Sequence, residues 1–424
     1  MTDRSTTGPH RRLADVRRSL PRGLTRAALV TISLLVGCLL AEVGASIWLH
    51  WIASDEQFRH YATLDQNRRR SRETGESLTV VEPHRYLGYV PAAEYRRGMN
   101  HHNSLGYRGE EIPRKRTPHE FRIAALGGST TYTSHVEDPK DAYPAVLQEL
   151  LRRRWHPEVR VINAGVPGWS SYETLINFEL RVLDLDPDMI LVYSGINDAL
   201  ARLVWPARYY RGDNSGRAIA DGRWFREPPL QQRSNAARML LIRTGRLMPV
   251  NSLLATFLSA PWHSRFLHYC AQVAQGTYPS GVFAEVPAEQ MLETNAPIYF
   301  RRNLQNLVAL AQHHEIAPVL ATFGLGDGFG DSCLATPLLR RAIEQQNQVI
   351  RDVASDLGAV LFDYAAVAPS DPSLYYDPVH LLADGARVKA ELFADFLIAR
   401  GLPPAPENRA EPRWASGGLN RDGA

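Results

Sequence analysis

Four short segments of the chain contain residue types that could together carry out acyl transfer from an ester. In chain order they are Gly127-Gly128-Ser129-Thr130, Asn163 to Gly168, Gly195-Ile196-Asn197-Asp198 and Asp377-Pro378-Val379-His380. A serine hydroxyl is a weak nucleophile until a base removes its proton. An aspartate three residues before a histidine can orient the imidazole through a turn and stabilise its charged form. We therefore interpret Ser129 as the nucleophile, His380 as its base and Asp377 as the residue that orients the base.

The same reaction needs hydrogen-bond donors where the negative charge of the tetrahedral intermediate develops. The backbone N–H groups of Ser129 and Gly168 and the side-chain amide of Asn197 are the candidates. Each residue also has a simpler structural interpretation. Ser129 could only cap a helix, Asn197-Asp198 could be a turn pair, and Gly168 could serve only its turn. His380 could be a surface histidine, with Asp377 a helix cap. The catalytic interpretation requires the four segments to meet in space.

The elements between these segments predict how they meet. Short apolar strands are expected at 121–126, 159–162, 189–193, 317–322 and 359–362, and helices at 142–154, 171–185, 303–313, 338–357 and 384–400. Strands that alternate with helices predict a parallel sheet covered on both faces. Active sites in such sheets lie at the carboxyl ends of the strands. The segments that follow the strands should therefore converge on one edge of the sheet.

The four segments, in this order, resemble the SGNH hydrolases, the GDSL-type esterases and lipases. The resemblance covers roughly residues 120–200 and 300–400. It implies a flavodoxin-like three-layer α/β/α sandwich with a five-stranded parallel sheet. It also implies Ser129, Gly168, Asn197 and His380 as the four family residues, with Asp377 as the third triad member. The apolar N-terminal segment, the Asn103–Arg108 stretch and the large insertion resemble a membrane-anchored bacterial subgroup.

One departure from the family pattern lies beside the nucleophile. The common Gly-Asp-Ser is Gly127-Gly128-Ser129 in this chain. The change removes a carboxylate next to Ser129 and leaves the triad residues untouched. It therefore bears on the subfamily and the rate more than on activity itself.

The N-terminus predicts a membrane anchor. Residues 1–26 carry seven arginines and two aspartates, and the apolar segment Ala27–Leu49 follows. As a helix, this segment would be about 34 Å long, enough to cross the hydrocarbon core. Arginines on the near flank predict a cytoplasmic N-terminus, so the rest of the chain is expected outside the cytoplasm, on the periplasmic side of a bacterial inner membrane. The alternative is a signal cleaved before Cys38, but the chain stays apolar beyond Cys38, which favours an anchor.

The apolar segment contains one acidic residue, Glu42. A charge within a span is unfavourable by about 2.5–3.5 kcal/mol on insertion scales. Two interpretations remain open from the sequence. Glu42 either contacts a partner membrane protein or is a tolerated residue near the outer interface.

The remaining organisation is predicted from composition. Residues 50–118 are expected to form a stalk and a short-strand extension, 119–400 the hydrolase domain with a cap inserted at 199–300, and 401–424 a disordered tail. Aromatic residues of the insertion either stack on sugar rings or form its own core. These residues are Trp205, Tyr209, Tyr210, Trp224, Trp262 and Tyr269.

Composition excludes several other classes of protein. With 424 residues, 44% hydrophobic and 22% charged, the chain is neither disordered nor a disulfide-dense miniprotein. Its 48 basic residues are nearly balanced by 45 acidic ones, so the net charge does not indicate a nucleic-acid partner. No zinc-type spacing of histidines or cysteines is present, and we expect no metal and no cofactor. His135 is expected in a loop that could line the site, and Cys270 and Cys333 could form a disulfide outside the cytoplasm.

The sequence therefore predicts a membrane-anchored serine esterase that hydrolyses carboxylic esters. Candidate substrates include an acylated glycan or lipid, and any protein partner is unknown. Two alternatives stay open. One is an O-acyltransferase or deacetylase acting on cell-envelope polysaccharide, and the other is a non-catalytic binding module of the envelope.

Overall fold

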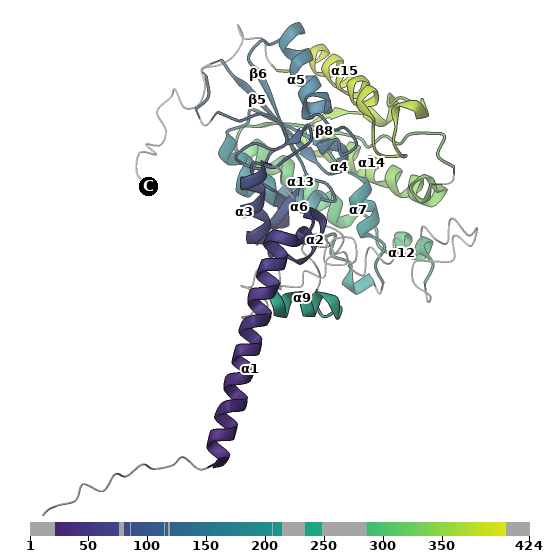
Figure 1. The fold of residues 1–424 in the computed structure, drawn as a ribbon. Coiled ribbons are helices and arrows are strands. Elements are labelled where there is room, and N and C mark those ends of the chain that lie inside the picture. Colours follow the sequence, from purple (N-terminus) through teal and green to yellow (C-terminus); the bar gives the residue numbers. More distant parts are fainter. Residues whose placement is uncertain are drawn as a thin grey trace, which may run out of the picture. The chain divides into compact units, whose positions relative to one another are not determined.

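The computed structural model describes residues 22–75, 80–84, 86–113, 115–117, 119–205, 207–213, 234–247, 286–330 and 332–403. These residues form two compact units. The first contains the described residues up to Tyr61 together with 234–247, and the second contains all the others. Figure 1 shows the helices and strands of both units.

The second unit is built on a five-stranded parallel sheet. Its strands are β5 (Phe121–Gly127), β6 (Val159–Gly165), β7 (Met189–Tyr193), β8 (Ala317–Ala321) and β9 (Val360–Phe362), in the spatial order β6-β5-β7-β8-β9. All neighbouring pairs run parallel. Numbered along the chain, this is the order 2-1-3-4-5 of flavodoxin-like sheets, which confirms the predicted fold class. The strand order reverses at β5 and β7, and ligands bind such sheets at that point.

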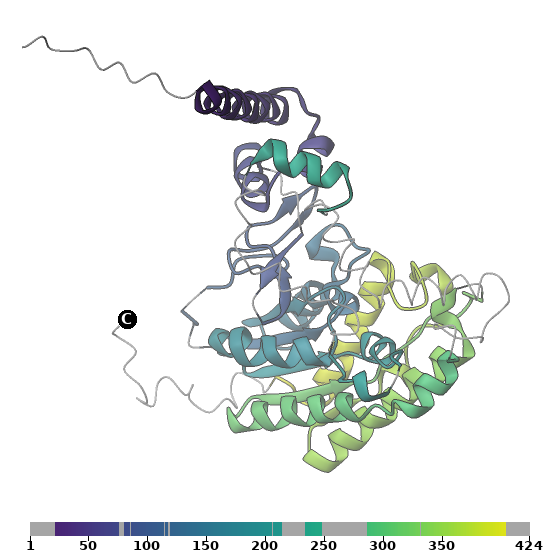
Figure 2. The same ribbon diagram turned by 90° about the horizontal axis from the view of Figure 1, so that it is seen from below.

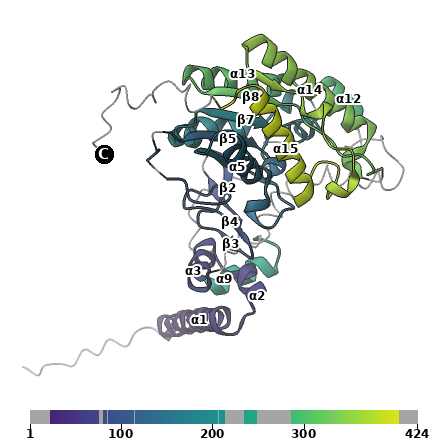
Figure 3. The same cartoon turned by 90° about the horizontal axis from the view of Figure 1, so that it is seen from above.

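Helices cover both faces of the sheet, as the apolar runs of the strands require. All seven residues of β5 and all five of β7 are buried. On one face they pack against α5 (Tyr143–Arg154) and α15 (Ala383–Ala399). On the other they pack against α13 (Ile298–His313). The helix α14 (Pro337–Leu357) contributes to both cores, and it lies beside α13 (Figures 2 and 3).

Three elements differ from their predicted bounds by more than one residue or in helix type. Strand β6 extends through Gly165, because Asn163 to Gly165 continue to pair with the end of β5. The segment predicted as one helix over 171–185 contains three helix types: α6 (Ser171–Asn177), the π-helix η3 (Phe178–Val182) and the 3₁₀ turn η4 (Leu183–Leu185). Helix α13 begins at Ile298, five residues before its predicted start at Asn303.

Several short elements complete the second unit. Before the sheet come α3 (Leu64–Thr74), the hairpin of β1 (Val81–His84) and β2 (Gly88–Pro91), and the pair β3 (Arg96–Arg97) and β4 (Asn100–His101). Within or beside the predicted cap lie α7 (Ile196–Ala201), η5 (Ala207–Tyr209) and α12 (Ala288–Thr294). The remaining elements are α4 (Ser129–Tyr132) and the 3₁₀ turns η2 (Pro139–Asp141), η8 (Cys333–Ala335), η9 (Tyr364–Ala366) and η10 (Pro372–Leu374).

Two aromatic residues of the predicted cap have described side chains that pack inside the protein. Trp205 is half-buried against the sheet core, and Tyr210 is buried with its ring edge-on to Tyr299. Trp224, Trp262 and Tyr269 lie outside the described residues, as do Cys270 and the tail from residue 404 onward. Cys333 is disulfide-bonded, and Cys38 is a free thiol.

The first unit is helical. It contains α1 (Arg22–Ile47), the π-helix η1 (Trp48–Ile52), α2 (Asp55–Tyr61) and α9 (Asn235–Arg243). In the part of the chain that the structure describes, the stretch Arg26–Ile52 is the one helix long and apolar enough to cross a membrane. Its leucines from Leu29 to Leu40 are about two-thirds exposed, whereas Leu49 is buried, so the described residues do not cover the surface of the helix before its last turn.

Candidate active site

Ser129 follows a sharp turn at the carboxyl end of β5. Gly127 has a φ of 154°, and a Cβ at this position would lie 2.2 Å from the carbonyl oxygen of Tyr193. Only glycine fits such a backbone so close to a neighbouring strand. The chain then enters the one-turn helix α4, of which Ser129 is the first residue. The turn leaves Ser129 partly exposed at the edge of the sheet.

The structure brings Ser129, His380 and Asp377 into one hydrogen-bonded chain. The Oγ atom of Ser129 lies 2.8 Å from Nε2 of His380. On the other side of the ring, Nδ1 of His380 lies 2.8 Å from Oδ2 of Asp377. This geometry lets Nδ1 donate its proton to Asp377 while Nε2 accepts the proton of the serine hydroxyl.

Asp377 is held as a carboxylate by its surroundings. Its Oδ1 accepts the backbone N–H groups of Val379 and His380, each at 2.9 Å. Burial alone would raise the pKa of Asp377, but the hydrogen bond and charge of His380 and the two backbone donors together lower the pKa below its usual value. Asp377 therefore stays ionised at neutral pH and fixes the tautomer and orientation of His380.

The loops after β6 and β7 meet beside Gly128. The amide nitrogen Nδ2 of Asn197 donates to the carbonyl oxygen of Trp169 at 2.9 Å. A Cβ placed on Gly128 would lie 2.8 Å from this nitrogen and 3.1 Å from the Trp169 oxygen. The space that the family's usual aspartate would occupy is thus filled by Asn197 and by Trp169 of the loop after β6. Gly168 lies in that same loop, with a φ of 83° that suits glycine.

Asp198, predicted only as part of a turn pair, is a buried anchor for α6. It is 4% exposed, and its Oδ1 accepts the hydroxyl of Ser171 at 2.6 Å and the backbone N–H of Ser171 at 3.0 Å. The Ser171 hydroxyl in turn accepts a hydrogen bond from Asn303 at 2.9 Å. These contacts fix the start of α7, and therefore Asn197, relative to α6.

Arg108, from the Asn103–Arg108 stretch, organises the segment that follows Ser129. Its guanidinium is buried and donates to the carbonyl oxygens of Tyr132 at 2.6 Å, Thr133 at 2.7 Å and Glu137 at 3.1 Å, and also to that of Val136. It also stacks over the ring of Tyr132 at 4.6 Å. The sequence did not predict this role for the Asn103–Arg108 stretch. The partners of Arg108 are backbone atoms about 25 residues away, and no side-chain motif marks them.

Tyr89 makes a similar contact with the loop after β6. Its hydroxyl donates to the carbonyl oxygen of Pro167, and a Cβ on Gly168 would lie 2.7 Å from this hydroxyl. The ring is also edge-on to Trp169 at 6.0 Å. The short-strand extension therefore contacts two of the loops that form the site.

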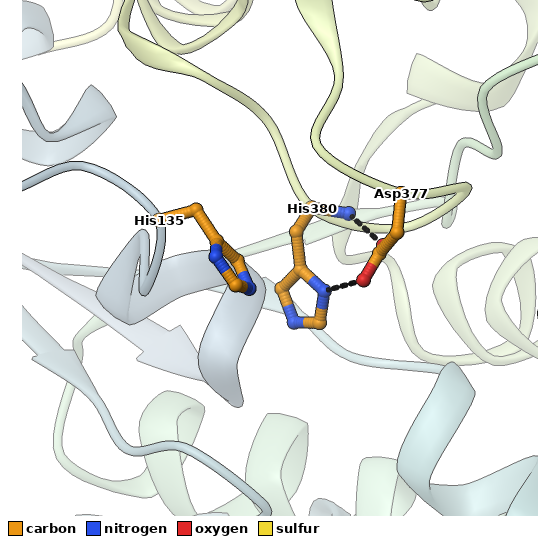
Figure 4. A group of neighbouring side chains, drawn as sticks. All are labelled: His135, Asp377 and His380. Atoms are coloured by element: carbon orange, nitrogen blue, oxygen red, sulfur yellow. Dashed lines mark hydrogen bonds and ion pairs between the residues drawn. The ribbon is translucent and has the colours of Figure 1, made fainter.

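His135 lies closer to the triad than its sequence position indicated. Its ring centroid is 4.9 Å from that of His380, and it stacks on the ring of Tyr376 at 3.8 Å. Figure 4 shows His135 and the carboxylate of Asp377 on opposite sides of the His380 ring. Desolvation by the groups around its ring lowers the pKa of His135, and the charge of His380 acts in the same direction. No sequence pattern marks Tyr376 as a residue of this site.

The atoms of His135, Asp377 and His380 are close enough to be considered as metal ligands, lying within 4.8 Å of one another. Both ring nitrogens of His380 already face hydrogen-bond partners, Ser129 and Asp377. The arrangement is therefore accounted for by the triad with one neighbouring histidine. The chemistry it supports is nucleophilic attack by an activated serine.

The sequence and the structure were both compared with known proteins. The model of the GDSL-like lipase/acylhydrolase family matches residues 125–388, more than half of the chain. No curated protein matches the chain. Similar solved structures include a lipase/acylhydrolase from Enterococcus faecalis (16% identity, 66% of this chain and 96% of that chain, TM-score 0.37). Another is the acetylxylan esterase Axe2 from Geobacillus stearothermophilus (15% identity, 66% and 95%, TM-score 0.36).

A third similar structure is a lipolytic protein of the G-D-S-L family from Desulfitobacterium hafniense, described as putative (14% identity, 65% and 98%, TM-score 0.35). At these identities and TM-scores, the structural similarities support no conclusion about substrate. The family assignment rests on the match over residues 125–388, which contains Ser129, Gly168, Asn197, Asp377 and His380. The chain belongs to the GDSL-like lipase/acylhydrolase family, and it is a serine hydrolase acting on ester bonds.

Proposed function

We propose that the protein is a membrane-anchored extracytoplasmic esterase that removes acyl groups, acetyl among them, through an acyl-serine intermediate. The observation that supports this most directly is the hydrogen-bonded chain from Ser129 through His380 to Asp377, with both links at 2.8 Å. This arrangement gives the nucleophile its base and gives the base an orienting carboxylate.

In the first half of the reaction, Oγ of Ser129 attacks the carbonyl carbon of the ester, and Nε2 of His380 takes the hydroxyl proton. The imidazolium that forms is stabilised by Asp377, which remains a carboxylate. When the tetrahedral intermediate collapses, the bond to the alcohol oxygen breaks, and His380 gives its proton to the departing alcohol. The acyl group is then esterified to Ser129.

The oxyanion of the intermediate is stabilised by donors that are fixed in place before the reaction. We assign this role to the backbone N–H groups of Ser129 and Gly168 and to the side-chain amide of Asn197. The hydrogen bond from Asn197 to the Trp169 carbonyl orients the amide plane. Tyr89 holds the loop that carries Gly168. Donors that need no reorganisation stabilise the developing charge most effectively.

In the second half, a water molecule attacks the acyl carbon while His380 takes one of its protons. Collapse of this second intermediate releases the carboxylic acid and returns the proton from His380 to Oγ of Ser129. If a sugar hydroxyl takes the place of water, the same steps transfer the acyl group to the sugar. A hydrolase and an O-acyltransferase therefore share this site and differ in the acceptor.

The location follows from α1 and the residues before it. The helix is long and apolar enough to span a bilayer, and seven arginines lie within residues 1–26. We infer that residues 1–26 stay in the cytoplasm, that residues 27–49 span the membrane and that the catalytic residues lie on the far side. The substrates available there include acylated components of the cell envelope.

Acylated glycans are the substrate class that the site favours. Tyr376 is 59% exposed, and its ring stacks on His135 beside the triad. Exposed aromatic rings at the entrance of a site can stack on the apolar face of a sugar. This observation favours deacetylation or acyl transfer on cell-envelope polysaccharide as the second candidate function.

Purified full-length protein in detergent, assayed with 4-nitrophenyl acetate, tests the proposal. Ser129→Ala should abolish turnover, whereas Ser355→Ala, a change of an exposed serine on α14, should leave it unchanged. Adding sugar acceptors separates the two enzyme functions, because a hydrolase releases only free acid. Absence of turnover in the wild-type protein on nitrophenyl esters and acetylated glycans alike would favour a non-catalytic envelope module.

A further inference from the structure

The carboxylate of Glu42 is the feature of the first unit that the esterase function leaves unexplained. Glu42 is the only charged side chain of the segment Ala27–Leu49. It lies seven residues before Leu49, which as a helix is about 10 Å from the far end of the segment. A carboxylate at such a depth is unfavourable unless hydrogen-bond donors satisfy its oxygens.

The donors to Glu42 come from the same chain, almost two hundred residues away. Its Oε2 accepts the hydroxyl of Ser234 at 2.5 Å and the backbone N–H of Ala236 at 3.0 Å. Its Oε1 accepts the backbone N–H of Asn235 at 2.9 Å. Backbone N–H groups of the first turn have no partner within their own helix, so Glu42 acts as a cap for α9. The one acidic residue of the span is thus hydrogen-bonded to the segment inserted between β7 and β8.

Two further contacts fix α9 within the unit. The side-chain amide of Asn235 donates to the hydroxyl of Ser46, one turn along α1 from Glu42, at 2.9 Å. Arg238 is buried, and it donates to the carbonyl oxygen of Tyr61 at the end of α2 at 2.6 Å. Helix α9 is therefore bound to α1 at its start and to α2 one turn later.

The outward side of α9 has the composition of a helix at a membrane surface. Leu240 is 64% exposed, and Arg243 and Arg246 are exposed beyond it. In the same unit, Trp51 is 85% exposed and Ile52 is 67% exposed just after α1. Exposed apolar side chains next to arginines and tryptophan are typical of segments at the boundary between lipid and water.

We propose that α9 is an interfacial helix that lies in the outer surface of the bilayer and is docked there by Glu42. The partner is the lipid itself, and the inserted segment contacts the membrane in addition to the span. This inference rests on the proposal that residues 27–49 cross the membrane, and it does not depend on the esterase activity. It gives Glu42 an intramolecular role in place of a contact with another membrane protein.

The test uses full-length protein reconstituted in phosphatidylcholine vesicles. A thiol-reactive, environment-sensitive fluorophore is attached at Leu240→Cys in a Cys38→Ser background, and the same background without the new cysteine measures stray labelling. Doxyl-labelled lipid should quench the probe strongly, and aqueous iodide should quench it weakly. Carbonate extraction of the same vesicles shows whether the chain is integral to the membrane.

The role of Glu42 is tested with Glu42→Leu, which makes the span more apolar and so cannot act by preventing insertion. Losing the cap should lower the docking equilibrium of α9 by about five-fold or more, and quenching by lipid should fall with it. Glu56→Gln, a change of an exposed glutamate on α2, is the matched control and should leave quenching unchanged.

A probe that iodide reaches freely in the protein with Glu42 would overturn the interfacial position of α9. Equal lipid quenching with and without Glu42 would overturn the docking role. Protein extracted by carbonate would overturn both this inference and the proposed anchor. Hydrolysis of 4-nitrophenyl acetate by the same vesicles reports separately on the esterase.

Discussion

The hydroxyl of Ser129 and the imidazole of His380 lie within hydrogen-bond distance, 2.8 Å apart, across 251 residues of chain. The serine comes from the turn after β5, the second strand in the sheet order, and the histidine comes from the loop after β9, the last strand in that order. Asp377 precedes His380 by three residues and holds its other nitrogen. The fold therefore brings the Ser129 hydroxyl to an imidazole that Asp377 already orients.

Asp377→Asn tests the orienting carboxylate. The amide keeps the size of the side chain but stabilises the wrong tautomer of His380, so kcat should fall by about 10⁴-fold. The measurement is kcat for 4-nitrophenyl acetate, with far-UV circular dichroism to confirm folding. Asp384→Asn, at an exposed position in the first turn of α15, is the matched control. A kcat within a few-fold of wild type would show that Asp377 has no part in the reaction.

Gly128 and Asn197 should behave as a coupled pair. Asn197→Ala should lower kcat by about 10²–10³-fold through loss of an oxyanion donor. Gly128→Asp restores the residue common in the family, yet we expect it to lower kcat, because its Cβ would lie 2.8 Å from the Asn197 amide. The double variant should be little worse than the worse single variant, since both act on one donor. Full additivity of the two effects would argue against this shared cause.

How far the sequence predicted this site depends on the kind of contact. The meeting of Ser129, His380 and Asp377 could be predicted because the carboxyl ends of parallel strands lie at one edge of the sheet, so the residue types after each strand were sufficient. The contacts of Arg108 could not be predicted, because its partners are backbone carbonyl oxygens, which every residue has. The position of Tyr376 beside His135 depends on how two irregular loops fold, and no periodic pattern encodes this. The donors to Glu42 come from a segment almost two hundred residues away.

Arg108→Met should destabilise the loop after the nucleophile. The change removes the guanidinium donors to four carbonyl oxygens, of which those of Tyr132 and Thr133 keep one other donor. We therefore expect a loss of about 3 kcal/mol in the free energy of unfolding and a lower kcat. Thermal unfolding in detergent and kcat are the two measurements. Arg97→Met, at an exposed position of β3, serves as the control. Unchanged thermal stability together with unchanged kcat would show that the loop holds itself in place.

Acid stability should depend on Glu120. Burial alone would raise its pKa, but hydrogen bonds and charges from Arg122 and Arg160 lower the pKa below its ordinary value of 4.5. A lowered pKa means that the unfolded chain binds the proton more readily, so the stabilisation is full above about pH 4.5 and is lost as the pH falls through the folded-state pKa. Glu120→Gln should therefore destabilise the protein at pH 7 and flatten the decline of stability below pH 4.5.

Urea unfolding at a series of pH values measures this dependence. Glu149→Gln is the matched control, because Glu149 is 63% exposed and its ion pair with Arg153 is long, at 3.6 Å. An exposed pair of this kind contributes little to stability. If the free energy of unfolding of Glu120→Gln depends on pH as that of the wild type does, the loss of stability in acid comes from other carboxylates.

The most direct test of the account is covalent labelling of the native protein with a fluorophosphonate probe, followed by peptide mapping. The probe reacts with serine hydroxyl groups that a base has activated. We predict a single major adduct on Ser129 in the full-length wild-type protein, and its loss in His380→Ala. Folded wild-type protein that remains unlabelled, or that carries its adduct on another serine, would contradict the assignment of Ser129 as the nucleophile.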